Sequence, residues 1–140
     1  MFALIRHAGY HFNSGSLTET GSQKAILLAE RLKTDDVRWK DILSAPSART
    51  RETALLVSKT LTIPYRIDTR LEPGQNLVSF FPPNNLEETI FVSHLPVITK
   101  ILRVWSRFLK IPEPPLVEVA NGYIVDPDQK TIQPIYETGA

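Results

Sequence analysis

Residues 2–9 read FALIRHAG, and this stretch decides how the rest of the chain is interpreted. The apolar run over 2–6 indicates a short buried strand, but it ends on Arg6 and His7, which are large, polar and prone to carry positive charge. Such side chains are costly to place at a strand end unless something anionic lies against them. The alanine and glycine that follow are small enough for a ligand to approach the backbone closely. We therefore expect an anion at the end of this strand.

Length and composition bound the class of protein. At 140 residues the chain is long enough for one real core, so residues 1–140 are expected to form a single domain. Sixteen Lys and Arg face fifteen Asp and Glu, so no global field favours nucleic acid or a membrane surface, and neither is expected as a partner. The first apolar run reaches a charge after five residues, which fits neither a signal peptide nor a membrane span, and the cytoplasm is the expected location.

The residues that bind metals are few. The chain has no cysteine, which excludes disulfides, thiol catalysis and cysteine-built zinc sites. Its three histidines, His7, His11 and His94, show no HExxH or His-x-His spacing. We expect no metal and no other cofactor, and we expect His11 to be a loop residue without a role.

Strand-like and helix-like segments alternate along the chain. Ala25, Leu28 and Ala29 lie at helical spacing with Thr18 as N-cap, and TIFVSH at 89–94 is the continuous apolar run of a strand buried on both faces. The full prediction is strands at 2–6, 41–45, 63–67 and 89–94, helices at 19–33, 47–61 and 97–109, and a hairpin over 122–136.

This succession of strand–helix units favours an α/β fold. We predict a three-layer sandwich in which helices flank both faces of a mainly parallel sheet, with the C-terminal β-hairpin at an edge. The proline within 63–67 argues for an edge position of that strand, and the proline-rich stretches FFPPNN and KIPEPPL are predicted to be turns or loops.

The helix predicted at 97–109 has two contrasting sides. One side is a broad apolar arc that includes Trp105 and Phe108, both predicted to be core residues. The opposite side carries four cations at three- and four-residue spacing: Lys100, Arg103, Arg107 and Lys110. The simpler interpretation is a solvated helix face, and the alternative is a docking stripe for an acidic partner.

Polar side chains follow three of the predicted strands. Arg6 and His7 end the first strand, Arg49 follows the second, and His94 closes the strand at 89–94. In open parallel sheets, ligands bind beyond the carboxyl ends of the strands, so these side chains should converge. Guanidiniums suit phosphate oxygens, and helices that begin near residues 47 and 96 would add N–H donors. A neutral imidazole is also a nucleophile toward phosphorus, so the predicted site is a phosphate pocket with the means for phosphoryl transfer.

Four segments in order, LIRHAG (4–9), LTETG (17–21), SAPSARTRETA (44–54) and FVSHLP (91–96), resemble the histidine phosphatase superfamily, also called phosphoglycerate-mutase-like. The short chain resembles the SixA-type phosphohistidine phosphatases in particular. The resemblance implies that His7 is the phosphorylated nucleophile and that Arg6, Arg49 and His94 hold the phosphate. It also implies a phosphate contact for Asn13, six residues after the nucleophile.

Two departures from the family pattern bear on the chemistry. Ala8 replaces the glycine of the RHG motif, which requires a backbone torsion that tolerates a β-carbon. Glu72 in TRLEPG is the candidate for the general acid of family monoesterases, although it follows Leu71 one residue sooner than the family spacing. The resemblance to SixA-type members implies a site without that acid. Arg51 is an additional cation that is expected to pair with a neighbour such as Glu52 or to lie at the surface.

The resulting hypothesis is a metal-independent phosphatase with a covalent phosphohistidine intermediate. Its expected substrate is phosphohistidine on a signalling phosphoprotein, such as a histidine-containing phosphotransfer domain, because a P–N bond is labile and needs no dedicated acid. Two alternatives stay open: a small-molecule phosphomonoesterase that acts on a sugar or nucleotide phosphate, and a catalytically silent phosphate-binding or adaptor domain.

Overall fold

The computed structural model describes residues 1–33 and 37–136. The elements, in chain order, are β1 (Phe2–Arg6), α1 (Glu19–Leu32), β2 (Asp41–Ser44), α2 (Ala48–Leu61), β3 (Tyr65–Ile67), the short 3-10 helices η1 (Thr69–Leu71) and η2 (Val78–Phe80), β4 (Thr89–Ser93), α3 (Leu95–Leu109), β5 (Gly122–Asp126) and β6 (Thr131–Pro134). Among the described residues, no helix is both long and apolar enough to cross a lipid bilayer.

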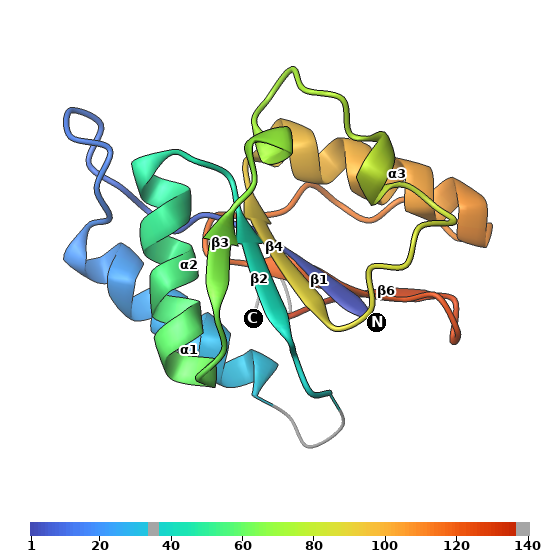
Figure 1. The fold of residues 1–140 in the computed structure, drawn as a ribbon, viewed down its shortest axis with the longest axis horizontal. Coiled ribbons are helices and arrows are strands. Elements are labelled where there is room, and N and C mark those ends of the chain that lie inside the picture. The colour runs from blue at the N-terminus through green and yellow to red at the C-terminus, as the bar shows by residue number, and fades with distance from the viewer. Residues whose placement is uncertain (34–36, 137–140) are drawn as a thin grey trace.

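The strands form one sheet in the order β3-β2-β4-β1-β5-β6 (Figure 1). The pairs β3–β2, β2–β4 and β4–β1 are parallel, whereas β5 pairs antiparallel with β1 and β6 pairs antiparallel with β5. The predicted mainly parallel sheet with a hairpin at one edge is confirmed. The strand that follows Pro64 lies at the other edge, as its proline indicated.

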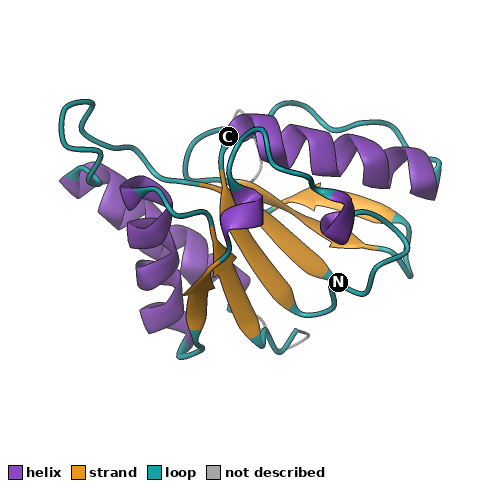
Figure 2. Ribbon diagram, turned by 45° about the horizontal axis from the view of Figure 1, so that its top comes forward, coloured by secondary structure: helices purple, strands orange, loops and turns teal. Residues whose placement is uncertain are grey.

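Helices cover both faces of this sheet (Figure 2). Successive residues of β1 point to opposite faces, so Phe2 and Leu4 join the core beneath α3 while Ala3 and Ile5 join the core beneath α1 and α2. This alternation produces two separate apolar layers with the sheet between them. The three-layer α/β sandwich is therefore the observed architecture.

Helix α3 packs with most of the apolar arc that the sequence predicted, since Val97, Ile101 and Leu109 are buried. Trp105 is buried as expected, but Phe108 is 56% exposed, so its assignment to the core was wrong. Ile98 and Leu102 are also buried, so the buried stripe extends beyond the predicted arc on one side and stops short of Phe108 on the other. The helix also begins two residues earlier than predicted, at Leu95, and includes Pro96 in its first turn. Proline is tolerated there, because the N–H groups of a first turn have no carbonyl partner within the helix and the one that proline lacks is not missed.

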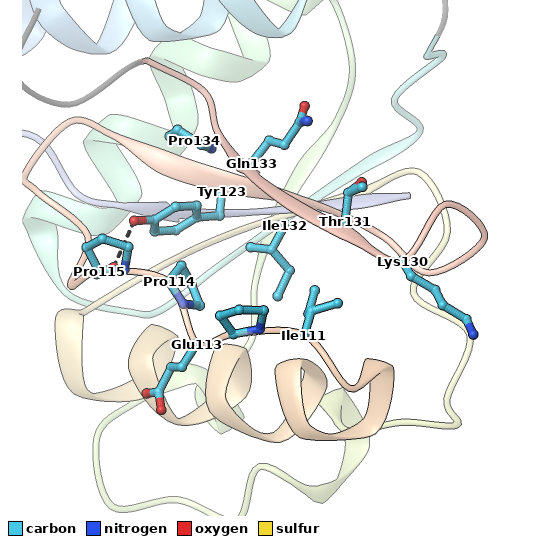
Figure 3. Close-up of a pocket in the computed structure, with 11 residues that line it drawn as sticks. Ile111, Glu113, Pro114, Pro115, Tyr123, Lys130, Thr131, Ile132, Gln133 and Pro134 are labelled. Atoms are coloured by element: carbon cyan, nitrogen blue, oxygen red, sulfur yellow. Dashed lines mark hydrogen bonds between the residues drawn. The ribbon is translucent and has the colours of Figure 1, made fainter.

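The proline-rich segment 111–117 has no regular structure, as predicted, and it lies between α3 and the β5–β6 hairpin (Figure 3). The hydroxyl of Tyr123 on β5 donates a hydrogen bond of 2.8 Å to the carbonyl of Pro115. This contact holds the segment against the sheet and brings its last residue, Val117, next to the end of β1, where Val117 accepts a hydrogen bond from Arg6.

The first turn of α1 rests against the loop that follows His7. Thr18 caps the helix by accepting the N–H of Gly21 at 2.9 Å, and the N–H of Thr18 donates to the carbonyl of Gly9 at 3.0 Å. Gly21 leaves no room for a side chain, because a β-carbon there would lie 2.1 Å from the carbonyl oxygen of Gly9. The glycine of LTETG therefore sets the distance between α1 and this loop.

We predict that Gly21→Ala lowers the free energy of unfolding by about 1–3 kcal/mol, because the added methyl overlaps backbone that cannot move freely. Alanine within a helix would otherwise stabilise by up to about 1 kcal/mol. Gly9→Ala is the matched control, because its β-carbon would meet only ordinary contacts at 3.8 and 3.9 Å. Urea denaturation followed by circular dichroism measures both, and equal stabilities of the two variants would contradict this packing.

Candidate active site

The carboxyl ends of β1, β4 and β2 lie side by side. In the sheet register Arg6 is opposite Ser93, and Ser44 is opposite Val92. The ladder continues one residue past the strands, since the N–H of His7 donates to the carbonyl of Ser93 at 3.2 Å. The residues that follow the three strands are therefore delivered to one rim, as expected for the ligand-binding end of a parallel sheet.

His7 and His94 face each other at this rim. Their ring centroids are 5.4 Å apart with an interplanar angle of 63°, and the residues are only 5% and 8% exposed. Nδ1 of His7 lies 3.0 Å from the carbonyl oxygen of Ala8. Because a carbonyl oxygen only accepts, this hydrogen bond places the proton on Nδ1 and leaves the lone pair on Nε2 free.

Both imidazoles are held neutral. Burial lowers the pKa of His7, with smaller contributions from the charges of Arg49 and Arg6, against the opposing effect of the Ala8 hydrogen bond. Burial, followed by the charges of Arg49, His7 and Arg6, lowers the pKa of His94 to about 4. Near pH 7 the His7 side chain therefore has an available nucleophilic lone pair without the help of a general base.

The two arginines expected at the site present hydrogen-bond donors that the protein does not use. Nη1 of Arg6 donates to the carbonyl of Val117 at 3.1 Å, which fixes the guanidinium beside His7. Within residues 1–33 and 37–136, the buried Nε atoms of Arg6 and Arg49 have no hydrogen-bond partner. Buried donors are almost always paired in folded proteins, so two such groups beside two imidazoles indicate a place for an anionic ligand.

Tyr10 connects the nucleophile loop to α2. Its ring lies edge-on to the His7 ring with centroids 5.4 Å apart, and the Cζ atom of Arg49 lies 4.6 Å from the Tyr10 ring centroid. These contacts orient an imidazole that follows β1 and a guanidinium that comes from α2. Sequence reasoning missed Tyr10, because a single aromatic residue in a loop belongs to no periodic pattern.

Thr53 on α2 supports the backbone next to the nucleophile. Its hydroxyl accepts the N–H of Ala8 at 3.0 Å and donates to the carbonyl of Arg49 at 2.8 Å. Ala8 is fully buried and its backbone lies outside the left-handed region, so alanine fits where the family motif has glycine. Sequence reasoning also missed Thr53, although the residue lies within the SAPSARTRETA segment on which the resemblance rests.

Two helices begin at the same rim. Ser47 is the N-cap of α2 and its Oγ lies 3.4 Å from Nε2 of His94, which is itself the N-cap residue of α3. The first turns of both helices carry unpaired N–H groups and the positive end of the helix dipole. The site therefore combines two guanidiniums with two helix N-termini, and its electrostatic potential favours an anion.

Glu72 also reaches this site. It follows η1, and η1 is tied to β4 by the hydroxyl of Ser93, which donates to the carbonyl of Leu71 at 2.8 Å. A pocket of about 340 Å³ is lined by Pro46, Ser47, Arg49, Glu72, Pro73 and His94. The structure thus brings the candidate acid together with Arg49 and His94, while its catalytic role stays a prediction.

Asn13 and Arg51 lie elsewhere. Asn13 is exposed in a loop that is closed by a bridge between Tyr10 and Leu17 and that projects from the molecule (Figure 1). Arg51 is exposed on α2 and its Nε donates to the carbonyl of Pro46 at 2.9 Å, whereas Glu52 accepts the N–H of Leu17. The structure does not place Asn13 among the residues around His7, and its phosphate contact stays a prediction.

The model of the histidine phosphatase superfamily (branch 1) matches residues 2–73, which is more than half of the chain. These residues include Arg6, His7, Arg49 and Glu72. The chain belongs to the histidine phosphatase superfamily, branch 1.

Solved structures share this fold. The protein histidine phosphatase SixA complexed with tungstate aligns with a TM-score of 0.71 and 22% identity over 94% of this chain and 93% of that chain. The putative phosphohistidine phosphatase SixA from Agrobacterium tumefaciens gives a TM-score of 0.70 and 20% identity over 91% and 90%. The serine/threonine-protein phosphatase Pgam5, mitochondrial, of Caenorhabditis briggsae is 30% identical over 112 residues, which are 77% of this chain. The chain spans only 38% of the length of that curated relative.

We predict that the pair of buried histidines makes stability depend on pH. The unfolded chain binds the His94 proton with a pKa of 6.5 and the folded protein with a pKa of about 4, so unfolding takes up a proton between these values. The free energy of unfolding should therefore fall by about 2 kcal/mol on account of His94 between pH 7.5 and pH 5, and the lowered pKa of His7 acts in the same direction.

Urea titrations at pH 7.5 and pH 5 measure this difference. In His94→Gln the difference should shrink by about 2 kcal/mol, because glutamine does not titrate. His11→Gln, in an exposed loop, should keep the difference of the unmodified protein. Equal pH dependence in His94→Gln and the unmodified protein would show that His94 does not titrate as the burial implies.

Proposed function

We propose that this chain is a metal-independent phosphatase that works through a covalent phosphohistidine on His7. The observation that carries the proposal is a neutral, buried imidazole that leaves Nε2 free and lies 5.4 Å, between ring centroids, from a second imidazole, next to two guanidinium Nε donors without partners among the described residues. Membership of the histidine phosphatase superfamily supports it. The SixA relative is a protein histidine phosphatase complexed with tungstate, which is a tetrahedral oxyanion of the size of phosphate.

In the first step the Nε2 lone pair of His7 attacks phosphorus and forms a P–N bond while the bond to the leaving group breaks. The leaving group departs with that bond's electron pair. Arg6, Arg49 and His94 hold the peripheral oxygens, where preorganised donors stabilise the charge of the transition state. The Nδ1 proton stays on the ring and is held by the Ala8 carbonyl, so the imidazolium charge partly offsets the phosphoryl charge.

In the second step water attacks the same phosphorus atom and the P–Nε2 bond breaks. The electron pair of this bond returns to His7, and both water protons leave on dihydrogen phosphate. The imidazole is again neutral, which its buried position favours. No step needs a metal ion, because the guanidiniums and the N-termini of α2 and α3 supply the positive charge.

The proposed substrate is phosphohistidine on a signalling phosphoprotein, such as a histidine-containing phosphotransfer domain. When the substrate phosphohistidine carries a proton on its other ring nitrogen, the imidazole departs as a neutral group with the electron pair of the P–N bond, so no acid is needed at the leaving nitrogen. An alkyl phosphate instead releases a poor alkoxide, and an acid that protonates it is worth about 10²–10⁴ in rate. Arg49 and His94 line a pocket that is open to the surface, which suits a protein-borne phosphoryl group.

One observation favours a second candidate, a small-molecule phosphomonoesterase. The carboxyl group of Glu72 lines the same pocket as Arg49 and His94. A protonated carboxyl group there would donate to the leaving oxygen of a sugar or nucleotide phosphate. The two candidates share the His7 chemistry and differ only in the need for this acid.

We predict that incubation with radiolabelled phosphoramidate gives an acid-labile phosphoryl label on the protein, and that His7→Ala abolishes both the label and turnover. His11→Ala is the control, because His11 lies in an exposed loop. Acid-quenched filter binding measures the label, and phosphate release measures turnover. Label that persists in His7→Ala would remove His7 as the nucleophile, and phosphate binding without any turnover would favour a silent adaptor domain.

We predict that Glu72→Gln changes the turnover of a phosphohistidine peptide by less than about threefold, because imidazole departs without an acid. For a phosphomonoesterase, the same substitution would lower turnover of alkyl phosphates by about 10²–10⁴. Glu30→Gln on the exposed side of α1 is the matched control. Steady-state assays measure the turnover of both substrates by each variant. Efficient hydrolysis of an alkyl phosphate that depends on Glu72 would contradict phosphohistidine as the substrate and favour the phosphomonoesterase.

A further inference from the structure

A groove runs along the outer face of α3. It has a volume of about 510 Å³ and is lined by Leu95, Pro96, Thr99, Lys100, Arg103, Val104, Arg107 and Leu116. Its apolar surface includes Leu116, which is 64% exposed on the proline-rich segment. Three cations, Lys100, Arg103 and Arg107, lie along it and are exposed. The groove thus pairs an apolar floor with a positive rim.

The positive charge along this groove is only partly neutralised by the described part of the protein. Helix α3 contains no acidic residue. Arg103 pairs with Glu113, whose carboxylate lies 3.1 Å from the arginine Nε and which points toward α3 in Figure 3. Lys100 and Arg107 form no ion pair within the described part of the chain. In a protein with a net charge of only +1, this is a local excess that complements a negatively charged partner.

One end of the groove lies at the N-terminus of α3, close to the candidate active site. Its first lining residue, Leu95, directly follows His94, whose imidazole faces His7. From Leu95 to Arg107 the helix rises about 18 Å, at 1.5 Å per residue. This length matches about three turns of a second helix. A partner segment in the groove would therefore have one end at the phosphoryl pocket.

We propose that this groove docks an acidic amphipathic helix of the phosphoprotein substrate. This proposal rests on the phosphatase function proposed above. Apolar side chains of that helix pack on Val104 and Leu116, and its carboxylates pair with Lys100 and Arg107. An apolar stripe bordered by acids fits both parts of the groove, in the helix-in-groove mode. The docked helix raises the local concentration of a phosphohistidine at its end near His94, so docking lowers KM and leaves the chemical step unchanged.

Binding is tested first, without any phosphoryl group. Fluorescein-labelled 15-residue peptides are compared: an acidic amphipathic helix, its lysine counterpart, and an acidic helix without apolar residues. Fluorescence anisotropy should give at least tenfold tighter binding of the first peptide to the unmodified protein. Lys100→Glu/Arg107→Glu should weaken that binding at least tenfold, and Leu116→Ser at least threefold.

Lys24→Glu/Lys59→Glu, on the exposed surfaces of α1 and α2, carries the same change in net charge and should bind the acidic peptide within twofold of the unmodified protein. Equal binding of this peptide to Lys100→Glu/Arg107→Glu and to the unmodified protein would overturn the proposal. Tighter binding of anionic lipid vesicles or of an oligonucleotide than of the peptide would assign the groove to another partner and would overturn it as well.

Turnover is tested next, with a phosphohistidine at either end of the acidic peptide and with phosphoramidate as the small substrate. Lys100→Glu/Arg107→Glu should raise KM for the peptide at least tenfold while kcat and the turnover of phosphoramidate stay within twofold. An unchanged KM would overturn the docking site. Peptide binding without hydrolysis of either substrate would leave docking in place and overturn the phosphatase function.

Discussion

The alignment of three parallel strand ends is the constraint on which the site depends. β1, β4 and β2 are hydrogen-bonded in a register that places Arg6 opposite Ser93 and Ser44 opposite Val92. One residue beyond, the chain leaves the sheet with His7 and His94 on neighbouring strands. A shift of one residue in the β1–β4 pairing would turn one of the two histidines to the opposite face of the sheet. The 5.4 Å between their rings is thus a property of the sheet register rather than of either loop.

This alignment has an electrostatic consequence that the surrounding structure has to support. Two guanidiniums and two imidazoles share a partly buried rim, and burial together with the arginine charges keeps both histidines neutral. Without a ligand the cations repel each other, so they must be held by other contacts. The Val117 carbonyl holds Arg6, and the Tyr10 ring holds Arg49. The donors that remain unpaired are those that a tetrahedral anion would use.

The sequence predicted most of the elements, because apolar periodicity, a threonine N-cap and proline positions are local signals. It also predicted that Arg6, His7, Arg49 and His94 share one rim, since each follows a strand. Strand order, the contact of Tyr10 with both His7 and Arg49, and the buried side of α3 depend on tertiary packing and have no local signal. Phe108 lies at one edge of a helical apolar arc that is wider than the sheet can cover. The apolar pattern alone does not indicate which edge of such an arc stays exposed.

Helix α3 links the candidate active site to the outer surface because it begins where β4 ends. His94 belongs to both, as the residue after the strand and as the N-cap of the helix. The positive end of the helix dipole therefore points at the rim that holds both histidines, and every charged residue of the helix is a cation. Lys100 and Arg107 lie along its solvent-exposed face, where water and salt screen their charge from that rim. The N-terminus of α3 thus favours an anion at the rim, and the cations along the exposed face of the same helix suit an acidic protein segment at a separate surface.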